Sequence, residues 1–257
     1  MTLWNRKIRI LEQLTIAKTA QMLNYSKVIC IGDSLTELAF DPTQFGLGSA
    51  LSHHFRRKAD VYNRGLSGYN SVWLEDQIDR ICLEFASSSN QVVLIILWLG
   101  TNDSVIPGNP HHVLESEFLT NLKKYTAKLL STFPDANLLL LTPAPINMTQ
   151  LQASNLSDSG KARTPELALQ YAQIVLKFFR EQCEPDPHVK CIDLYSLLGS
   201  GKDDDFYVDG IHLNSAGYRE VWNAVHQELV GWVELPPVEP HWTVKAGEQK
   251  LGEDYTG

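Results

Sequence analysis

Short apolar runs alternate with amphipathic segments along most of the chain, and this alternation restricts the fold more than any other feature. Between the runs, apolar residues recur at three- and four-residue spacing, as at Leu122, Tyr125 and Leu129, which is typical of helices with one buried face. Strands joined by helices require right-handed crossovers and form a mostly parallel sheet covered on both faces. The sequence therefore predicts an α/β fold. The predicted strands are residues 27–31, 59–63, 92–99, 137–142 and 189–194, and the predicted helices are residues 45–58, 72–87, 114–132, 164–183 and 215–231.

The length and charge of the chain narrow the kinds of partner that it can have. Its 257 residues, 44% of them hydrophobic, suffice for one sizeable core without a second globular domain. A formal net charge of -8 argues against nucleic acid and anionic membrane surfaces as partners, because both require basic protein surface. No apolar run is long enough to span a bilayer. Four cysteines without metal-ligand spacing indicate buried thiols in a reducing compartment, so the expected location is cytoplasmic.

Both ends of the chain are expected to lie outside this core. Trp4, Ile8 and Leu11 fall on one helical face, and the N-terminal segment lacks the continuous hydrophobic region of a secretory signal. We interpret this segment as an amphipathic lead-in helix, with an organelle presequence as the alternative. The predicted division is a lead-in helix at residues 1–26, an α/β domain at residues 27–233 and an extended tail at residues 234–257.

Polar and glycine-rich segments follow four of the predicted strands. Ser34 comes after the first strand and residues 65–68 after the second. Residues 100–103 follow the third strand, and residues 209–212 come after the fifth. In a parallel sheet, the carboxyl ends of the strands meet at one edge, where ligands bind. We therefore expect these four segments to form one site.

Three residues of these segments can form a nucleophilic triad. A serine hydroxyl is a poor nucleophile until a base accepts its proton, and the base needs a partner that fixes its tautomer. Asp209 precedes His212 by three residues, so one turn can place the carboxylate beside the imidazole. The sequence predicts that Ser34 attacks, that His212 accepts and returns the proton, and that Asp209 orients the imidazole ring.

Three groups at the same edge can donate hydrogen bonds to a developing negative charge. They are the main-chain N–H groups of Ser34 and Gly68 and the side-chain amide of Asn102, and we predict that they form an oxyanion hole. Loss of one such donor typically raises the barrier by about 3 kcal/mol. Each assignment has a plainer alternative. Ser34 can be a helix cap, Gly65 can replace Gly68, and Asn102 can be structural.

Four sequence blocks, in order along the chain, resemble those of the SGNH/GDSL hydrolase family. They read Gly-Asp-Ser-Leu at residues 32–35, Asn-Arg-Gly-Leu-Ser-Gly at residues 63–68, Gly-Thr-Asn-Asp at residues 100–103 and Asp-Gly-Ile-His at residues 209–212. Within the family, the chain most resembles the isoamyl-acetate-hydrolysing esterase branch.

The resemblance implies a flavodoxin-like, three-layer α/β/α sandwich with a five-stranded, mostly parallel sheet. It also implies ester hydrolysis through an acyl-enzyme, without a metal or cofactor. Ser34, Asp209 and His212 would form the triad, and Gly68 and Asn102 would donate to the oxyanion.

The leading hypothesis is a serine esterase that hydrolyses small carboxylic esters, with short acyl chains such as acetate favoured by the resemblance. An acyltransferase that uses the same triad with an alcohol acceptor is the alternative. A non-catalytic module that binds a flavin or phosphate is a third interpretation, but residues 32–34 form too short a loop to cradle phosphate.

The expected partner is a small-molecule ester, and homo-oligomerisation is left open. Trp73, Trp98 and Phe206 are candidate walls of the ester pocket.

Overall fold

The computed structural model describes residues 25–199 and 206–238, and Ser26–Pro236 form one compact unit. Most of the predicted lead-in helix and most of the predicted tail lie outside the described residues.

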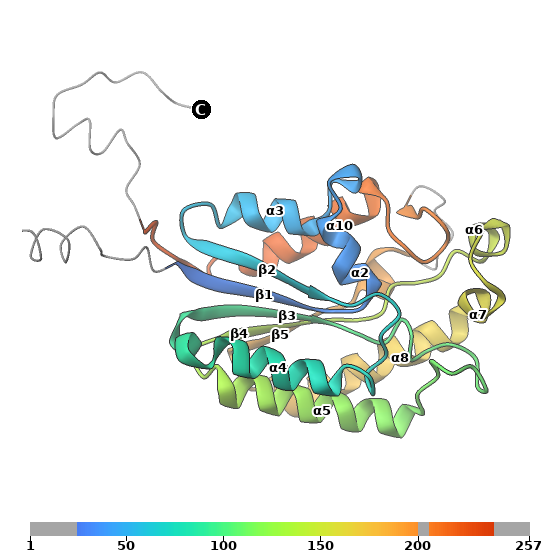
Figure 1. The fold of residues 1–257 in the computed structure, drawn as a ribbon, viewed down its shortest axis with the longest axis horizontal. Coiled ribbons are helices and arrows are strands. Elements are labelled where there is room, and N and C mark those ends of the chain that lie inside the picture. Colours follow the sequence, from blue (N-terminus) through green and yellow to red (C-terminus); the bar gives the residue numbers. More distant parts are fainter. Residues whose placement is uncertain (1–24, 200–205, 239–257) are drawn as a thin grey trace, which may run out of the picture. The chain divides into compact units, whose positions relative to one another are not determined.

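The compact unit is built on a parallel sheet with the strand order β2-β1-β3-β4-β5 (Figure 1). The residues that end the strands lie side by side, because Gly32 pairs with both Gly65 and Trp98, and Trp98 pairs in turn with Leu141. The carboxyl ends of the strands therefore form one aligned edge. The strands are β1 (Ser26–Gly32), β2 (Ala59–Gly65), β3 (Val92–Trp98), β4 (Asn137–Leu141) and β5 (Val189–Ile192).

Helices cover both faces of the sheet. The sheet and the two layers of helices together form the predicted three-layer sandwich. Figure 1 shows α2, α3 and α10 on one face and α4, α5 and α8 on the other. The helices of the described residues are α2 (Ser34–Glu37), α3 (Leu47–His54), α4 (Glu75–Phe85), α5 (Glu115–Thr132), α6 (Met148–Ala153), α7 (Asp158–Lys161), α8 (Pro165–Phe178), α9 (Leu194–Leu197) and α10 (Ser215–Leu229), with 3-10 turns at Leu38–Phe40, Pro42–Gln44 and Ala86–Gln91 and a π-helical turn at Phe179–Cys183.

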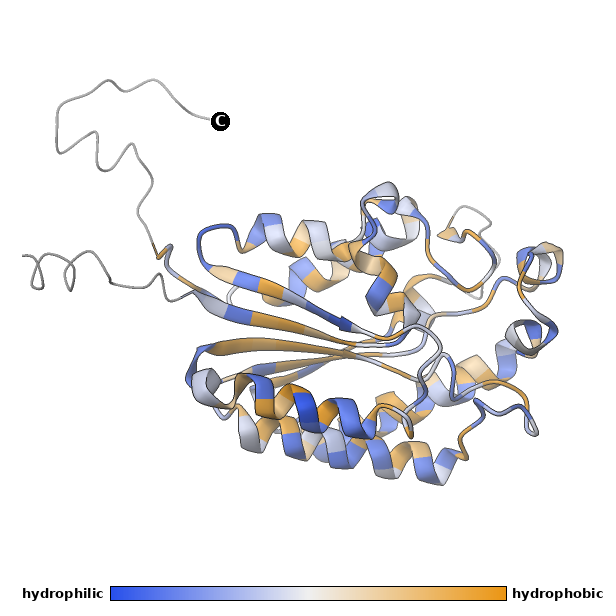
Figure 2. Ribbon diagram, in the orientation of Figure 1, coloured by the Kyte–Doolittle hydropathy of each residue, from blue (hydrophilic) through white to orange (hydrophobic). Residues whose placement is uncertain are grey.

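The strands read as continuous apolar runs because both of their faces are buried. Along β1, Ile29 and Ile31 pack into the core cluster beneath α4, α5 and α8. Val28 and Cys30, which point the other way, pack into the cluster beneath α3 and α10. Figure 2 shows this apolar character along the central strands. The predicted α/β fold with a five-stranded parallel sheet is confirmed.

Two of the predicted boundaries were wrong for local reasons, and two short helices were missed. The predicted helix at residues 45–58 ends at His54, because the chain turns there and Arg57 takes a positive φ of 63°. The fifth strand ends at Ile192 instead of residue 194, because Asp193 caps α9. The segment between β4 and α8 contains the short helices α6 and α7, which were not predicted.

All four cysteines lie in the described residues as free thiols, and three of them are buried. Of the helices in the described part of the chain, none has the length and apolar character that crossing a membrane requires.

Candidate active site

Ser34 is the first residue of α2, directly after β1. Asp33 is the N-cap of this helix, since its Oδ1 accepts a hydrogen bond from the Leu35 N–H at 2.9 Å. The alternative that Ser34 caps the helix is therefore wrong, and its hydroxyl is left for other contacts. Gly32 permits the tight turn from strand to helix, because a Cβ there would lie 2.2 Å from Oγ1 of Thr36.

A hydrogen-bonded chain links Ser34 to His212 and Asp209. Nε2 of His212 lies 2.9 Å from Oγ of Ser34, and Nδ1 lies 2.6 Å from Oδ2 of Asp209. A carboxylate only accepts hydrogen bonds, so Nδ1 carries the proton and Nε2 can accept the proton of the serine hydroxyl. The structure therefore brings the three predicted catalytic side chains together in the order nucleophile, base and orienting carboxylate.

The loop that carries Asp209 and His212 fixes the charge of the carboxylate. Oδ1 of Asp209 accepts hydrogen bonds from the main-chain N–H groups of Ile211 at 3.0 Å and His212 at 2.9 Å. Burial alone would raise the pKa of Asp209, but the hydrogen bonds from His212 and Ile211 outweigh it and hold the pKa below its usual value. Asp209 therefore stays ionised and can stabilise the imidazolium that forms when His212 takes a proton.

Gly68 lies in a tight turn after β2 and faces the same cavity as Ser34. The N–H of Tyr69 closes this turn on the Leu66 carbonyl at 3.1 Å, and Gly68 has a φ of +82°, which favours glycine at the third turn position. Among the described residues, no group accepts a hydrogen bond from the main-chain N–H of Gly68 or Ser34. Both donors are therefore available to a ligand.

Gly65, the alternative to Gly68, has a packing role. A Cβ on Gly65 would lie 2.2 Å from the main-chain nitrogen of Glu37. Only a glycine therefore lets the end of β2 approach α2 this closely. Gly65 does not line the cavity around Ser34, whereas Gly68 does.

Asn102 is held at both ends of its side-chain amide. Its Nδ2 donates to the Tyr69 carbonyl at 2.8 Å, and its Oδ1 accepts from Nη2 of Arg163 at 2.8 Å. An amide nitrogen carries two hydrogens, so the second N–H of Asn102 remains to donate into the cavity that Ser34 and Gly68 also line. The structural alternative and the predicted donor role are thus compatible, because one N–H serves each.

Arg163 is a site residue that the sequence analysis missed. The residue is only 8% exposed, and besides Asn102 its guanidinium donates to the carbonyl oxygens of Gly160 at 3.1 Å and Thr101. No motif surrounds it. The Arg-Thr-Pro sequence at residues 163–165 indicates a helix start, since Thr164 caps α8. It does not indicate an arginine that reaches the loop after β3.

Three nearby aspartates favour the charged form of this buried arginine. Burial lowers the pKa of Arg163 to about 10, and the negative charges of Asp33, Asp209 and Asp103 act against that shift, so the guanidinium stays charged at neutral pH. Burial also raises the pKa of Asp33 to about 6 and that of Asp103 to about 7. Oδ1 of Asp103 accepts from the Ser71 N–H at 2.8 Å, which ties the loop after β3 to the segment after β2.

Known proteins are similar to this chain over most of its length. The GDSL-like lipase/acylhydrolase family profile matches residues 30–220. The chain belongs to this family. It is 31% identical over 230 residues to the isoamyl acetate-hydrolyzing esterase 1 homolog of Bos taurus, and the matched region covers 86% of this chain and 88% of that relative. It is 26% identical over 221 residues to the isoamyl acetate-hydrolyzing esterase of Saccharomyces cerevisiae, with 82% and 87% covered.

Solved structures share the fold of this GDSL-family chain. An acetylxylan esterase of Geobacillus stearothermophilus has a TM-score of 0.58 at 16% identity and covers 84% of this chain and 97% of its own. A family 3 carbohydrate esterase of Clostridium thermocellum has a TM-score of 0.58 at 17% identity and covers 81% and 97%. The predicted family and the predicted class of enzyme, a carboxylic ester hydrolase, are confirmed by the family match and the curated relatives.

A cavity of about 330 Å³ opens at the triad of this GDSL-family chain, and its wall combines the polar groups above with apolar side chains. Trp73, Trp98 and Phe206, the predicted walls, do not line it. Trp98 is instead buried in the core, where its Nε1 donates to the Thr142 carbonyl at 3.0 Å. The apolar residues of the wall are Leu38, Val105, Leu156 and Ile211.

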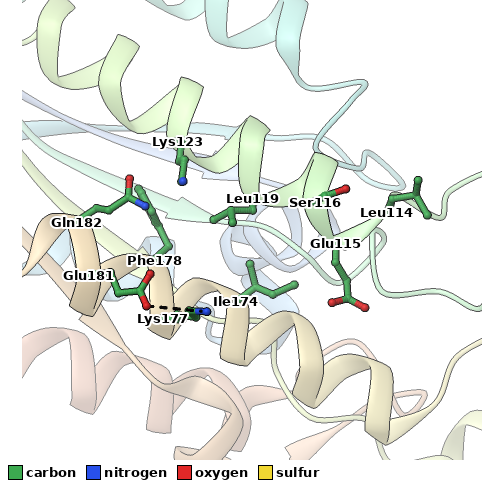
Figure 3. Close-up of a pocket in the computed structure, with 10 residues that line it drawn as sticks. All are labelled: Leu114, Glu115, Ser116, Leu119, Lys123, Ile174, Lys177, Phe178, Glu181 and Gln182. Atoms are coloured by element: carbon green, nitrogen blue, oxygen red, sulfur yellow. Dashed lines mark ion pairs between the residues drawn. The ribbon is translucent and has the colours of Figure 1, made fainter.

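A second hollow, of about 560 Å³, lies between α5 and α8 (Figure 3). Leu119, Ile174 and Phe178 contribute apolar surface, and Lys123 and Lys177 are among its charged residues. None of the four sequence blocks contributes to it, so it is not part of the candidate active site. Within residues 25–199 and 206–238, no cluster of three or more His, Cys, Asp or Glu side chains is arranged to hold a metal ion.

Proposed function

We propose that this chain is a serine esterase that hydrolyses small carboxylic esters through an acyl-Ser34 intermediate. The observation that carries the proposal is the chain of contacts from Oγ of Ser34 to Nε2 of His212 at 2.9 Å and from Nδ1 of His212 to Asp209 at 2.6 Å. This arrangement activates a hydroxyl that would otherwise be a poor nucleophile.

The proposed reaction has two halves. In acylation, Oγ of Ser34 attacks the ester carbonyl while Nε2 of His212 takes the hydroxyl proton, and His212 then protonates the departing alcohol. In deacylation, water gives a proton to His212 and attacks the acyl-enzyme, and the proton returns to Ser34 as the carboxylic acid leaves. The N–H groups of Ser34, Gly68 and Asn102 hold the negatively charged oxygen in both halves.

Short acyl groups are the proposed substrates. The cavity of about 330 Å³ lies near the lower end of the range of ligand pockets, which is about 300–1,000 Å³. A small ester fits such a volume. The curated relatives named as isoamyl acetate-hydrolyzing esterases support the same choice.

Labelling with a fluorophosphonate tests the nucleophile. We expect the parent protein to be labelled and Ser34→Ala to lose both the label and ester hydrolysis. Ser67→Ala is the matched control, because Ser67 lines the same cavity but its hydroxyl is not the one that is hydrogen-bonded to Nε2 of His212. Equal labelling of the parent and Ser34→Ala, or loss of labelling only in Ser67→Ala, would contradict the proposal. Product partition in the presence of an added alcohol measures how far acyl transfer competes with hydrolysis.

The pH dependence of hydrolysis tests the base. Protonated His212 has no lone pair at Nε2 and cannot take the proton of Ser34, so we expect kcat/KM to fall on acidification. The measurement is kcat/KM for one p-nitrophenyl ester from neutral to acidic pH, with circular dichroism to show that the fold persists. A flat profile in a protein that remains folded would exclude His212 as the base.

A further inference from the structure

A second histidine, His111, lies beside the oxyanion-hole glycine. It belongs to the loop between β3 and α5 and lines the same cavity as Ser34 and Asn102. If Gly68 carried a Cβ, the nearest atom outside its chain neighbours would be Nε2 of His111, at 3.9 Å. The Nε2 edge of this ring is therefore turned toward the space above Gly68, where the ester carbonyl is expected to bind.

Neighbouring groups fix the position of the His111 ring. The ring packs against Trp73 with a centroid distance of 4.9 Å, and the main-chain carbonyl of His111 accepts from Nδ2 of Asn70 at 2.9 Å. Nδ1 of the ring lies 3.2 Å from Oδ1 of Asn109. These contacts hold the backbone, the ring face and one ring nitrogen, so the orientation of Nε2 is determined by the fold.

The contact with Asn109 also decides the tautomer. Oδ1 of Asn109 accepts a hydrogen bond from the main-chain N–H of His111 at 3.0 Å, which identifies it as the carbonyl oxygen of the amide. Nδ1 must therefore be the donor in the ring contact, and in a neutral imidazole Nε2 is then an acceptor. Burial, together with the positive charge of Arg163, lowers the pKa of His111, which keeps the ring neutral at neutral pH.

Nε2 of His111 has no hydrogen-bond partner among the described residues. The N–H groups of Ser34, Gly68 and Asn102 are all donors, and they suit the carbonyl oxygen of the ester. An acceptor such as Nε2 of His111 cannot form a hydrogen bond with that oxygen, because both atoms lack a hydrogen to donate. It suits a hydrogen-bond donor elsewhere on the substrate.

We propose that Nε2 of His111 accepts a hydrogen bond from a hydroxyl group of the substrate, so that esters bearing a free hydroxyl near the scissile bond are the preferred class. The inference rests on the proposed function, because it concerns the substrate of the same site. The hydroxyl can come from the alcohol part, as in a monoester of a diol, or from the acyl part, as in an ester of a 2-hydroxy acid. The experiment separates these two sources.

The test compares esters that differ by replacement of a hydroxyl with a methyl group. One pair, 2-hydroxyethyl acetate and propyl acetate, varies the alcohol part, and the other, methyl glycolate and methyl propionate, varies the acyl part. We measure the ratio of kcat/KM within each pair for the parent and for His111→Phe, which keeps an aromatic ring against Trp73. Intrinsic reactivity of the esters cancels when the ratios of the two proteins are compared.

The expected result is that the ratio in favour of the hydroxyl ester falls by roughly 2- to 10-fold in His111→Phe for one pair, which identifies the part of the substrate that His111 contacts. His112→Phe is the matched control. Nδ1 of His112 is hydrogen-bonded to the Val105 carbonyl at 2.8 Å, and His112 does not line the cavity. The kcat/KM ratios of His112→Phe should therefore equal those of the parent.

Equal ratios in the parent and His111→Phe for both pairs would overturn the hydroxyl subsite while leaving the esterase proposal intact. A parallel loss for both members of each pair would also overturn it, because His111 would then serve the reaction or the shape of the pocket. If the parent hydrolyses no ester and Ser34 is not labelled by fluorophosphonate, the proposed function fails and this inference fails with it.

Discussion

At the scale of single residues, the buried Arg163 decides which atom of Asn102 faces the cavity. An amide side chain can rotate by half a turn and exchange its donor and acceptor ends, and only the donor end stabilises an oxyanion. The guanidinium holds Oδ1 of Asn102 at 2.8 Å, which leaves Nδ2 on the side of the Tyr69 carbonyl and the cavity. Arg163 is in this sense a positioning residue for the proposed donor.

We predict that Arg163→Lys lowers kcat by roughly 10- to 100-fold with a smaller effect on KM, because a donor that acts mainly in the transition state is misaligned. Lysine keeps the charge but cannot hold the Thr101 carbonyl and the Asn102 amide with a planar fork. The measurement is a double-mutant cycle with Asn102→Ala.

If Arg163 acts through Asn102, adding Arg163→Lys to Asn102→Ala lowers kcat by at most a few-fold more. Losses that multiply in full would show that the two residues act independently. Thermal unfolding of each variant controls for a general loss of stability, which would reduce the amount of active enzyme without this pattern of coupling.

At the scale of elements, two glycines three residues apart are required for different physical reasons. Gly65 ends β2 against α2, where a Cβ would lie 2.2 Å from the Glu37 nitrogen. Gly68 has a positive φ of +82° but open space around it, since the nearest atom to a Cβ would be 3.9 Å away. The first is needed for packing and the second for backbone conformation.

We therefore predict that Gly65→Ala destabilises the protein more than Gly68→Ala does. A side chain at a left-handed position typically costs about 1–2 kcal/mol, whereas a Cβ forced into backbone atoms must displace β2 from α2 and costs more. Urea unfolding of both variants measures the difference. A larger loss of unfolding free energy in Gly68→Ala would contradict this division of roles.

The elements that the sequence predicted well are those with a strong local signal. The buried strands are runs of apolar residues, and the long helices α5 and α10 show clear periodicity, so their boundaries fall within a few residues of the prediction. Helices α6 and α7 have six and four residues, too few to show a helical period. Their existence depends on contacts such as those of Leu151, which is fully buried in a small cluster with Ile146 and Ile211.

The same distinction applies to the candidate site. Ser34, Asp209 and His212 could be predicted because each follows a strand or has a spacing with a chemical meaning. Arg163 and His111 could not. Arg163 reaches Asn102 across 61 positions of sequence, and His111 approaches Gly68 only because two loops meet above the sheet. Contacts between distant loops leave no pattern in a single sequence.

At the scale of the whole molecule, the aligned strand ends place several ionisable groups beneath the candidate site. Asp33 and Asp103 are fully buried there, and each has one carboxylate oxygen without a hydrogen-bond partner among the described residues. Burial raises the pKa of Asp103 to about 7, and the nearby charge of Asp33 acts in the same direction. The stability of the fold must therefore depend on pH through these groups.

The sign of this dependence follows from the two states. In the unfolded chain, Asp103 titrates near the ordinary aspartate pKa of about 3.9. Between this value and about 7, the folded protein holds a proton that the unfolded chain has lost, so the free energy of unfolding falls as the pH rises. Asp103→Asn removes this contribution, while Asp33, whose pKa is raised to about 6, still titrates in both proteins.

We predict that the stability of Asp103→Asn relative to the parent increases between about pH 5 and about pH 8, whatever its value at the lower pH. The amide can still accept from the Ser71 N–H through Oδ1, and any constant cost of its new N–H groups cancels between the two pH values. Urea unfolding of both proteins at each pH measures the change. The same substitution at the exposed Asp135 controls for the loss of one negative charge. A relative stability that stays constant or decreases would mean that Asp103 is already ionised in the folded protein at the lower pH, with the positive charge of Arg163 favouring its ionised form.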